Sequence, residues 1–159
     1  MAAASIIGVI SDTHGLLRPE AEAALAGADL IIHAGDVGGA EILDALRRIA
    51  RVVAVRGNVD TDAWGRTLPM TELVEHAGVS IYVVHRIDDL DIEPAAAGVQ
   101  AVIYGHSHQP SIERRRGVLH LNPGSAGPRR FRLPTTIARL EVRDGRITDA
   151  RIVDLAAGA

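Results

Sequence analysis

The chain has 159 residues, of which 20 are acidic and 17 are basic, and all 17 basic residues are arginine. Because cysteine and lysine are absent, the composition excludes disulfides, thiolate catalysis, cysteine-based metal sites, Schiff-base lysines and P-loop lysines. The formal net charge of −3 argues against broad nucleic-acid binding by phosphate neutralisation. Seven histidines and the carboxylates are therefore the side chains left for catalysis or metal binding.

The length and the hydrophobic content of 47% predict one globular domain spanning residues 1–159. No apolar run approaches the roughly 20 residues that a membrane span needs, so we expect no membrane partner. The N-terminal sequence has no basic region and its apolar run stops at Asp12, which argues against a signal peptide. The cytoplasm is the default location.

The first third of the chain is predicted to alternate strands with helices. Short, nearly continuous runs of isoleucine and valine are typical of buried parallel strands. A proline at a first helical position and apolar residues at helical spacing indicate helices between them. The pattern predicts strands at Ser5–Ile10, Leu30–His33 and Arg51–Val55, with helices at Pro19–Ala26 and Gly39–Ala50. This β-α-β-α-β order is typical of a parallel sheet covered by helices.

The rest of the chain is richer in strands. Strands are predicted at Met70–His76, Val79–His85 and Gln100–Tyr104, with a short helix at Glu93–Gly98 before the last of them. Two turn signals predict hairpins that join Ser111–Arg116 to Val118–Leu121 and Thr135–Arg143 to Arg146–Leu155. No linker separates the two halves. The sequence therefore predicts an α/β domain with a mixed sheet or two packed sheets.

Five of the predicted strands end in, or lead directly into, side chains that can bind a metal ion. Glycines beside these side chains allow the backbone to turn sharply. Because the carboxyl ends of strands in open α/β sheets border one crevice, we expect these side chains to converge there. They are, in strand order, Asp12 and His14, then Asp36, then Asn58, then His85, and finally His106 and His108.

A structural role is the alternative for each of these residues taken alone. Asp12 and Asp36 are also typical helix N-caps, and Asn58 is a typical turn residue. Their joint placement at five strand ends favours a shared metal site. The remaining histidines, His33, His76 and His120, are interpreted as structural.

Taken in order, the motifs Asp-x-His, Gly-Asp, Gly-Asn, an isolated His and Gly-His-x-His resemble those of the calcineurin-like metallophosphoesterases. The similarity is greatest to their small single-domain bacterial and archaeal phosphodiesterases, which also carry the Asn-Pro-Gly-Ser element found at 122–125. The resemblance implies a four-layer α/β/β/α sandwich with two mixed β-sheets and a dinuclear metal centre between the sheet ends. It also implies the ligands: Asp12, His14 and His108 for one metal, Asn58, His85 and His106 for the other, and Asp36 for both.

This ligand set has a consistent chemistry. Seven ligands are too many for one tetrahedral zinc and suit two ions with larger coordination shells. Because four of the seven are imidazoles, the set favours Mn, and also Fe, Ni, Co or Zn, over Mg or Ca. Two such ions and a bridging hydroxide that attacks phosphorus in line need no nucleophilic side chain. In this scheme Asp36, Asn58 and His85 are catalytic through the metal-bridged hydroxide.

The sequence departs from the family pattern at two positions. Many members have a histidine after Gly-Asn, proposed to protonate the leaving group, where this chain has Val59. The change predicts slower turnover and a preference for good leaving groups. The usual Gly-His after the isolated histidine is replaced by Arg86-Ile87, where Arg86 either faces a substrate phosphate or is solvated.

Four further residues are assigned supporting roles. Arg129 and Arg130 follow the Asn-Pro-Gly-Ser element and are predicted to contact phosphate, together with Arg132. Asp60 is predicted to accept a hydrogen bond from a ligand histidine and so orient it, with an Asx-turn as the alternative.

The sequence thus predicts a metal-dependent phosphoesterase that acts on small phosphodiesters, with phosphomonoesters as a second substrate class. One alternative is a non-catalytic scaffold with the same fold, like the retromer subunit, and another is a metal-binding regulatory or storage module. Retention of all seven ligand positions favours the enzyme. The sequence leaves the physiological substrate, the native metal and a homo-oligomeric state open.

Overall fold

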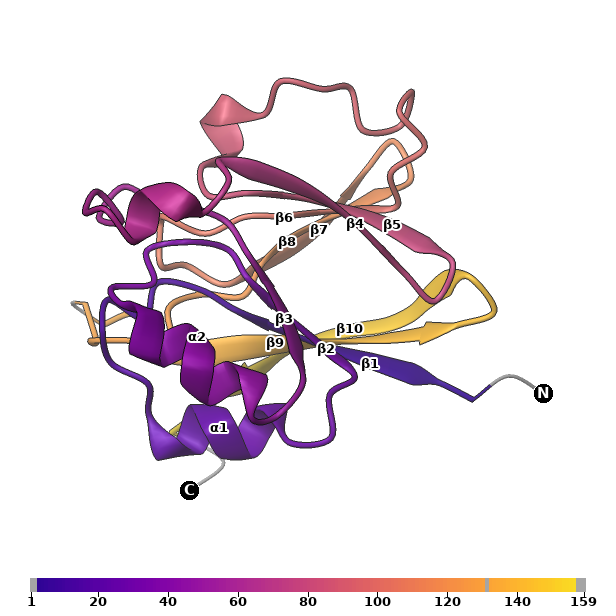
Figure 1. Ribbon diagram of the computed structural model, residues 1–159. Coiled ribbons are helices and arrows are strands. Elements are labelled where there is room, and N and C mark those ends of the chain that lie inside the picture. Colours follow the sequence, from indigo (N-terminus) through magenta and orange to yellow (C-terminus); the bar gives the residue numbers. More distant parts are fainter. Residues whose placement is uncertain (1–2, 131, 157–159) are drawn as a thin grey trace.

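Two five-stranded β-sheets packed face to face form the centre of the computed structural model, which describes residues 3–130 and 132–156 (Figure 1). Both sheets are mixed, so the predicted α/β class with two mixed sheets is confirmed. The predicted domain of residues 1–159 also includes residues 1–2, 131 and 157–159, which lie outside the described ranges.

The first sheet has the strand order β10-β9-β1-β2-β3. Ile10 pairs with His33, and His33 pairs with Ala54, so three parallel strands end at one level. The parallel strands are β1 (Ser5–Ile10), β2 (Leu30–His33) and β3 (Arg51–Ala54), and the hairpin of β9 (Thr136–Arg143) and β10 (Arg146–Asp154) lies antiparallel to β1.

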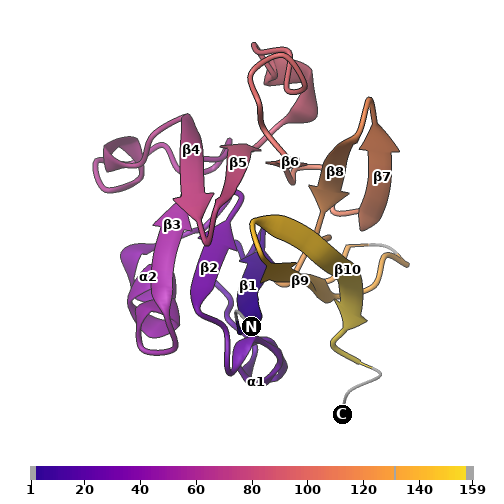
Figure 2. The same cartoon turned by 90° about the vertical axis from the view of Figure 1, so that its right-hand side faces the viewer.

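The second sheet has the strand order β4-β5-β6-β8-β7. Its strands are β4 (Thr71–His76), β5 (Val79–Val84), β6 (Ala101–Ile103), β7 (Ser111–Arg115) and β8 (Val118–Asn122). β5, β6 and β8 are parallel, while β4 and β7 are antiparallel edge strands. Figure 2 shows β4 beside β3 at one edge of the sandwich.

The central strands β1 and β2 of the first sheet are buried on both faces, which explains their nearly continuous apolar sequences. Ile7 and Val9 of β1 pack in the core between the sheets with Ile81 and Ile103 of the second sheet. Ile10, on the other face of β1, packs in a second core beneath the helices. These two hydrophobic layers fix the first sheet between the second sheet and the helices.

Helices α1 (Pro19–Leu25) and α2 (Ala40–Arg47) cover the outer face of the first sheet (Figure 1). A Cβ atom at Gly8 would lie 2.5 Å from Cδ2 of Leu25, so the glycine in β1 permits close packing of α1. The helix predicted at Gly39–Ala50 is shorter than expected, because its last three residues form the turn into β3. Within the described residues, no helix has the length and apolar character needed to cross a membrane.

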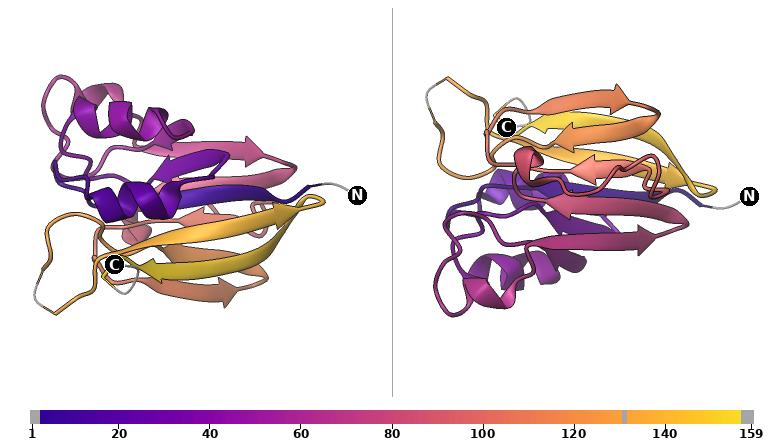
Figure 3. Two further views of the ribbon diagram at one scale, coloured as in Figure 1. Left: turned by 90° about the horizontal axis from the view of Figure 1, so that it is seen from below. Right: turned by 90° about the horizontal axis from the view of Figure 1, so that it is seen from above.

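The segment between β5 and β6 covers the outer face of the second sheet (Figure 3, right). It contains a 3-10 helix, η2 (Ile87–Asp89), and a turn in which the Ala97 N–H donates to the Glu93 carbonyl. The prediction of a helix at Glu93–Gly98 is therefore wrong. Six residues ending in Gly98, whose φ is 75°, are too few to offset the cost of starting a helix.

Candidate metal centre

The loops that follow β1, β2, β3, β5 and β6 lie at the same end of the sandwich, on the left in Figures 1 and 3. Backbone hydrogen bonds tie these loops together. The N–H of His14 donates to the carbonyl of Asp36 over 2.9 Å, and the N–H of Gly105 donates to the carbonyl of His85 over 2.9 Å. The structure therefore brings together the strand ends that the sequence predicted to converge.

Asp12, His14 and His108 form a first group of side chains able to hold a metal ion, with one ligand atom of each within 4.8 Å of the others. Oδ1 of Asp12 lies 3.4 Å from Nε2 of His108 and 3.8 Å from Nε2 of His14. The two imidazole rings have centroids 5.3 Å apart. Asp12 and His108 are buried and His14 is half-buried, so solvent reaches this group from the His14 side.

Asp36, His85 and His106 form a second group with the same spacing of ligand atoms. Oδ2 of Asp36 lies 3.2 Å from Nε2 of His85, and the rings of His85 and His106 are nearly perpendicular at 5.3 Å. The two groups adjoin, because Oδ2 of Asp36 also lies 3.6 Å from Nε2 of His14. Two carboxylates thus stand between four imidazoles, with Asp36 in contact with both groups.

Three side-chain atoms of the cluster are buried without a hydrogen-bond partner among the described residues: Oδ1 of Asp12, Nε2 of His85 and Nδ1 of His108. Nδ1 of His85 lies 2.7 Å from the carbonyl oxygen of Ala34. Because a carbonyl only accepts, Nδ1 carries the hydrogen, and Nε2 of the neutral ring presents its lone pair to the cluster. Buried polar atoms are normally paired, and carboxylate oxygens with imidazole nitrogens are ligands of divalent transition metals. The residues therefore fit such ions.

The backbone of the cluster is strained. Outside the cluster, three non-glycine residues among those described have a positive φ. They are Ala77, Arg116 and Asp144, and each precedes a glycine in a hairpin turn. Left-handed backbone is unfavourable for a residue with a Cβ and persists where the surrounding contacts enforce it, often at functional sites. Five residues of the cluster adopt it, with φ values of 57° at Asp12, 47° at His14, 56° at Asp36, 73° at His106 and 64° at His108.

Two glycines allow neighbouring loops to approach the carboxylates. A Cβ atom at Gly57 would collide with Oδ1 of Asp36. One at Gly105 would lie 2.7 Å from Oδ2 of Asp12. The glycines beside the predicted ligands are thus required for close approach to these carboxylates.

Charge within the cluster favours the ionised carboxylates of Asp12 and Asp36 and the protonated imidazoles of His14 and His85. Burial raises the pKa of Asp12, but the nearby imidazoles of His108 and His14 outweigh it and hold that pKa well below its usual range. For Asp36, burial is likewise outweighed by His85, so its pKa is lowered. Asp12 raises the pKa of His14, and Asp36 raises that of His85 against the effect of burial. A metal ion must displace these protons, so its affinity falls as the pH is lowered.

Asp60 holds together the loops that follow β2 and β3. Its buried carboxylate accepts the N–H groups of Val37 at 3.1 Å, Gly57 at 2.9 Å and Gly38 at 3.0 Å. The predicted hydrogen bond from a ligand imidazole to Asp60 is absent from the described residues, because these three backbone donors occupy the carboxylate. Asp60 therefore positions the proposed ligands through the backbone of their loops.

Asn58 and Val59 lie on the solvent side of the cluster. Asn58 is exposed and lines a cavity of about 370 Å³ that His85 and Arg86 also line. The side chain of Val59 is 49% exposed, while its N–H donates to Oδ1 of Asp36 over 2.9 Å. The position that holds a histidine in many family members is thus open to solvent and carries no proton donor.

Three of the four arginines predicted to contact a substrate phosphate are Arg86, Arg129 and Arg130, and the fourth, Arg132, is exposed. Arg86 follows His85 directly, and its Nε atom is buried without a partner among the described residues. Arg129 and Arg130 are exposed on the loop after Ser125. Arg130 lies close enough to His14 for its charge to oppose the larger effect of Asp12 on the pKa of that histidine.

Two serines that the sequence analysis did not assign fix Asp12 in place. The hydroxyl of Ser11 donates to Oδ2 of Asp12 over 2.7 Å, and that of Ser125 donates to the Asp12 carbonyl over 3.1 Å. Nδ2 of Asn122 donates to the carbonyl of Gly105 over 3.2 Å. The Asn-Pro-Gly-Ser element at 122–125 is the feature of the sequence that could have indicated this role. Its Asn122 and Ser125 side chains bind the backbone of the two loops that carry Asp12 and His106.

His33 has the structural role expected of it. Its Nδ1 accepts the N–H of Gly35 at 3.1 Å, and its Nε2 lies 3.0 Å from the hydroxyl of Thr13. That hydroxyl donates to the Val37 carbonyl, so Nε2 carries the hydrogen of a neutral ring. Burial lowers the pKa of His33 to about 4. His76 and His120 lie outside both groups of the cluster, on strands β4 and β8.

The sequence model of the calcineurin-like phosphoesterase superfamily domain matches residues 6–145. The chain belongs to the calcineurin-like phosphoesterase superfamily. A probable metallophosphoesterase of Methanocaldococcus jannaschii is 41% identical over 152 residues, which cover 87% of this chain and 77% of the relative. The phosphodiesterase YfcE of Escherichia coli is 30% identical over 141 residues, which cover 72% of this chain and 76% of that enzyme.

Solved structures show the same fold. Vacuolar protein sorting 29 of Cryptosporidium parvum superposes with a TM-score of 0.74 at 18% identity, covering 96% of this chain and 98% of that one. The resemblance drawn from the sequence motifs is confirmed by the family model and by the relatives that are similar in sequence. The superfamily is metal-dependent, in agreement with the two groups of metal-capable side chains.

Replacing His33 with Gln should remove an acid-sensitive contribution to stability. The folded-state pKa of about 4 lies below the ordinary value of 6.5, so the contribution is complete above pH 6.5 and is lost as the pH falls towards 4. Between pH 7 and pH 5, unaltered metal-free protein should lose about 2 kcal/mol more unfolding free energy than His33→Gln. Urea denaturation measures the difference, with His33→Asn as a second variant. Equal pH dependence in all three proteins would contradict the assignment.

Replacing Asp60 with Asn should loosen the loops that carry the second group. The amide keeps one acceptor oxygen and places an N–H₂ against backbone donors, so we expect a loss of about 2 kcal/mol in unfolding free energy. We also expect weaker Mn(II) binding. The control is Asp62→Asn, because Asp62 is exposed and accepts a single N–H, from Gly65. Urea denaturation and Mn(II) titration measure both effects, and equal behaviour of the two variants would contradict the role of Asp60.

Proposed function

We propose that the protein is a phosphodiesterase whose centre holds two divalent cations. The observation that supports this proposal is the pair of adjoining ligand groups, in which Oδ1 of Asp12 and Nε2 of His85 are buried and unpartnered. We assign Asp12, His14 and His108 to one cation, Asn58, His85 and His106 to the other, and Asp36 to both. The contacts of Asp36 with His14 and His85 support its shared position.

Two bound cations would supply an activated water for attack on phosphorus and positive charge for the phosphoryl oxygens. The chain contributes rigid placement, because hydrogen bonds from Ser11 and from the backbone of His106 hold the Asp12 carboxylate. Nδ1 of His85 is held by the Ala34 carbonyl, which keeps Nε2 directed at the centre. No side chain needs to act as a nucleophile, in keeping with a chain without cysteine or lysine.

Mn(II) is the cation that we propose. Four imidazoles, two carboxylates and one amide form a mixed nitrogen and oxygen set, which Fe, Ni, Co or Zn can also occupy. Mg and Ca prefer shells made almost wholly of oxygen. Phosphodiesters are the proposed main substrates and phosphomonoesters a second class.

Three arginines are proposed to bind the substrate phosphate from opposite sides. Arg86 adjoins His85 and lines the same cavity as Asn58. Arg129 and Arg130 lie on the exposed loop beside His14, where a guanidinium fork suits phosphate oxygens.

A protein-interaction module with the same fold is the alternative function. It is supported by the structural likeness to vacuolar protein sorting 29, but at 18% identity that likeness shows the fold alone. The phosphodiesterase YfcE is more similar in sequence, at 30% identity. The presence of six metal-capable side chains in two tight groups also favours catalysis over a purely interacting or metal-storing module.

Asp36→Ala and His108→Ala should each lower Mn(II)-dependent hydrolysis of bis-p-nitrophenyl phosphate by at least about 100-fold, because each removes a proposed ligand. Asp44→Ala, on the exposed side of α2, and His76→Ala, in β4, are the matched controls and should retain activity. Circular dichroism checks that the variants fold. Failure of the unaltered protein to exceed the two ligand variants with any divalent metal would contradict the proposed function.

Val59→His should restore a proton donor for the leaving group. The N–H of residue 59 keeps its bond to Asp36, so the new imidazole extends from the same backbone position. We expect kcat/KM for a phenyl phosphodiester to rise by about tenfold and that for the p-nitrophenyl analogue to change little, since a poor leaving group needs the proton more. Val59→Gln is the size-matched control. An equal rise for both esters would exclude general acid catalysis as the cause.

A further inference from the structure

A cavity of about 370 Å³ adjoins the second group of the proposed centre. Asn58 and His85, both proposed ligands, are among its lining residues, so a phosphoryl group held at the centre would have this cavity beside it. Its volume lies near the lower end of the range for small-molecule sites. The cavity therefore suits one organic group of nucleoside size.

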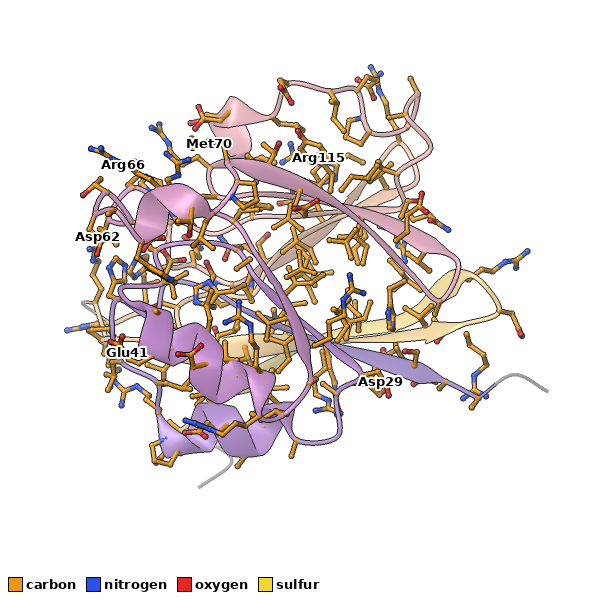
Figure 4. All side chains as sticks on the ribbon, in the orientation of Figure 1. Asp29, Glu41, Asp62, Arg66, Met70 and Arg115 are labelled. Carbon is orange, nitrogen blue, oxygen red and sulfur yellow. The ribbon has the colours of Figure 1, made fainter. Side chains whose placement is uncertain are left out.

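One side of the cavity is apolar. Met70 lines it together with Thr71 of β4 and Val84 of β5, which are cross-strand partners. The side chain of Met70 is 59% exposed, although methionine is usually buried. Figure 4 shows Met70 near η2, at the same end of the molecule as Asp62 and Arg66. Met70, Thr71 and Val84 thus offer an apolar surface for a ring.

The charged residues of the cavity differ in how many of their hydrogen-bonding atoms lack a partner. Arg56 is occupied, because its Nε and Nη2 atoms donate to the Leu68 carbonyl over 3.2 and 3.1 Å. Arg86 has a buried Nε atom without a partner among the described residues. Asp89 is exposed on η2, and Asp91 accepts the Tyr82 hydroxyl through Oδ1 alone. The guanidinium of Arg86, beside His85, and the carboxylates of Asp89 and Asp91 are therefore available to a ligand.

We infer that this cavity binds the organic group of the phosphodiester, and that this group is nucleoside-sized, bears hydroxyl or N–H donors and carries no second phosphate. The inference rests on the proposed function. The carboxylates of Asp89 and Asp91 accept hydrogen bonds from hydroxyl groups such as those of a sugar. The same carboxylates repel a second phosphate. Arg86 lies next to His85, where it binds an oxygen of the phosphoryl group undergoing attack.

Three esters with the same p-nitrophenolate leaving group test this selectivity in the Mn(II)-loaded protein. We expect kcat/KM for thymidine 5′-(p-nitrophenyl phosphate) to exceed that for methyl p-nitrophenyl phosphate by about tenfold. An added 3′-phosphate on the thymidine ester should lower kcat/KM by about tenfold. If the methyl ester is hydrolysed as well as the thymidine ester, the inference is wrong and the proposed function stands. If none of the esters is hydrolysed, the proposed function fails.

Substitution of the carboxylates tests their part directly. The ratio of kcat/KM for the thymidine ester to kcat/KM for its 3′-phosphorylated form measures the discrimination against a second phosphate. Asp89→Asn combined with Asp91→Asn should lower this ratio by about tenfold. The matched control is Asp88→Asn, because Asp88 is an exposed residue of the same short helix that does not line the cavity. An unchanged ratio in the double variant would overturn the role of these carboxylates.

A binding measurement without metal or turnover completes the test. Thymidine added to ¹⁵N-labelled, metal-free protein should shift the amide signals of Met70, Thr71 and Asp89 in a saturable manner. Asp88→Asn should give the same shifts, and Met70→Glu should weaken them by placing a charge on the apolar side. Absence of shifts at these residues, or shifts confined to other parts of the chain, would overturn the inference whatever the activity of the protein.

Discussion

The structure depends on one buried carboxylate, Asp12, which is held among imidazoles at the junction of the two sheets. A buried charge is costly unless it is paired and hydrogen-bonded. Ser11 supplies a hydroxyl donor to Oδ2, while His108, His14 and His85 surround Oδ1 at 3.4 to 3.9 Å. These partners come from the loops after β1, β5 and β6. The charge of Asp12 is thus compensated only when both sheets are in place, which links the fold to the site.

The same arrangement accounts for the strained backbone. Left-handed conformations at residues such as Asp36 and His106 persist because contacts with the surrounding loops enforce them. Asp60 binds three backbone N–H groups across two loops, and Gly57 permits the close approach of its loop to Asp36. The two hydrophobic layers on either side of the first sheet provide the stability that offsets this strain. The side chains of the proposed ligands are therefore preorganised.

Much of this arrangement is predictable from the sequence because it depends on local signals. Buried strands show as runs of isoleucine and valine, and the Asp144-Gly145 pair indicates the hairpin of β9 and β10. The order of polar residues at strand ends predicts which of them meet. Two other features have no such signal. The partners of Asp60 are backbone N–H groups, which any residue but proline can supply, and the 93–98 segment is too short for local preference to decide its conformation.

The proposed centre binds two divalent ions side by side within the carboxylate and imidazole cluster. Electron paramagnetic resonance of the protein titrated with Mn(II), combined with elemental analysis, tests it most directly. We expect two manganese ions per chain and the hyperfine pattern of an exchange-coupled pair, because Asp36 contacts both groups. In Asp36→Ala the coupled signal should disappear. One ion per chain, or two ions with uncoupled signals, in the unaltered protein would contradict a dinuclear centre.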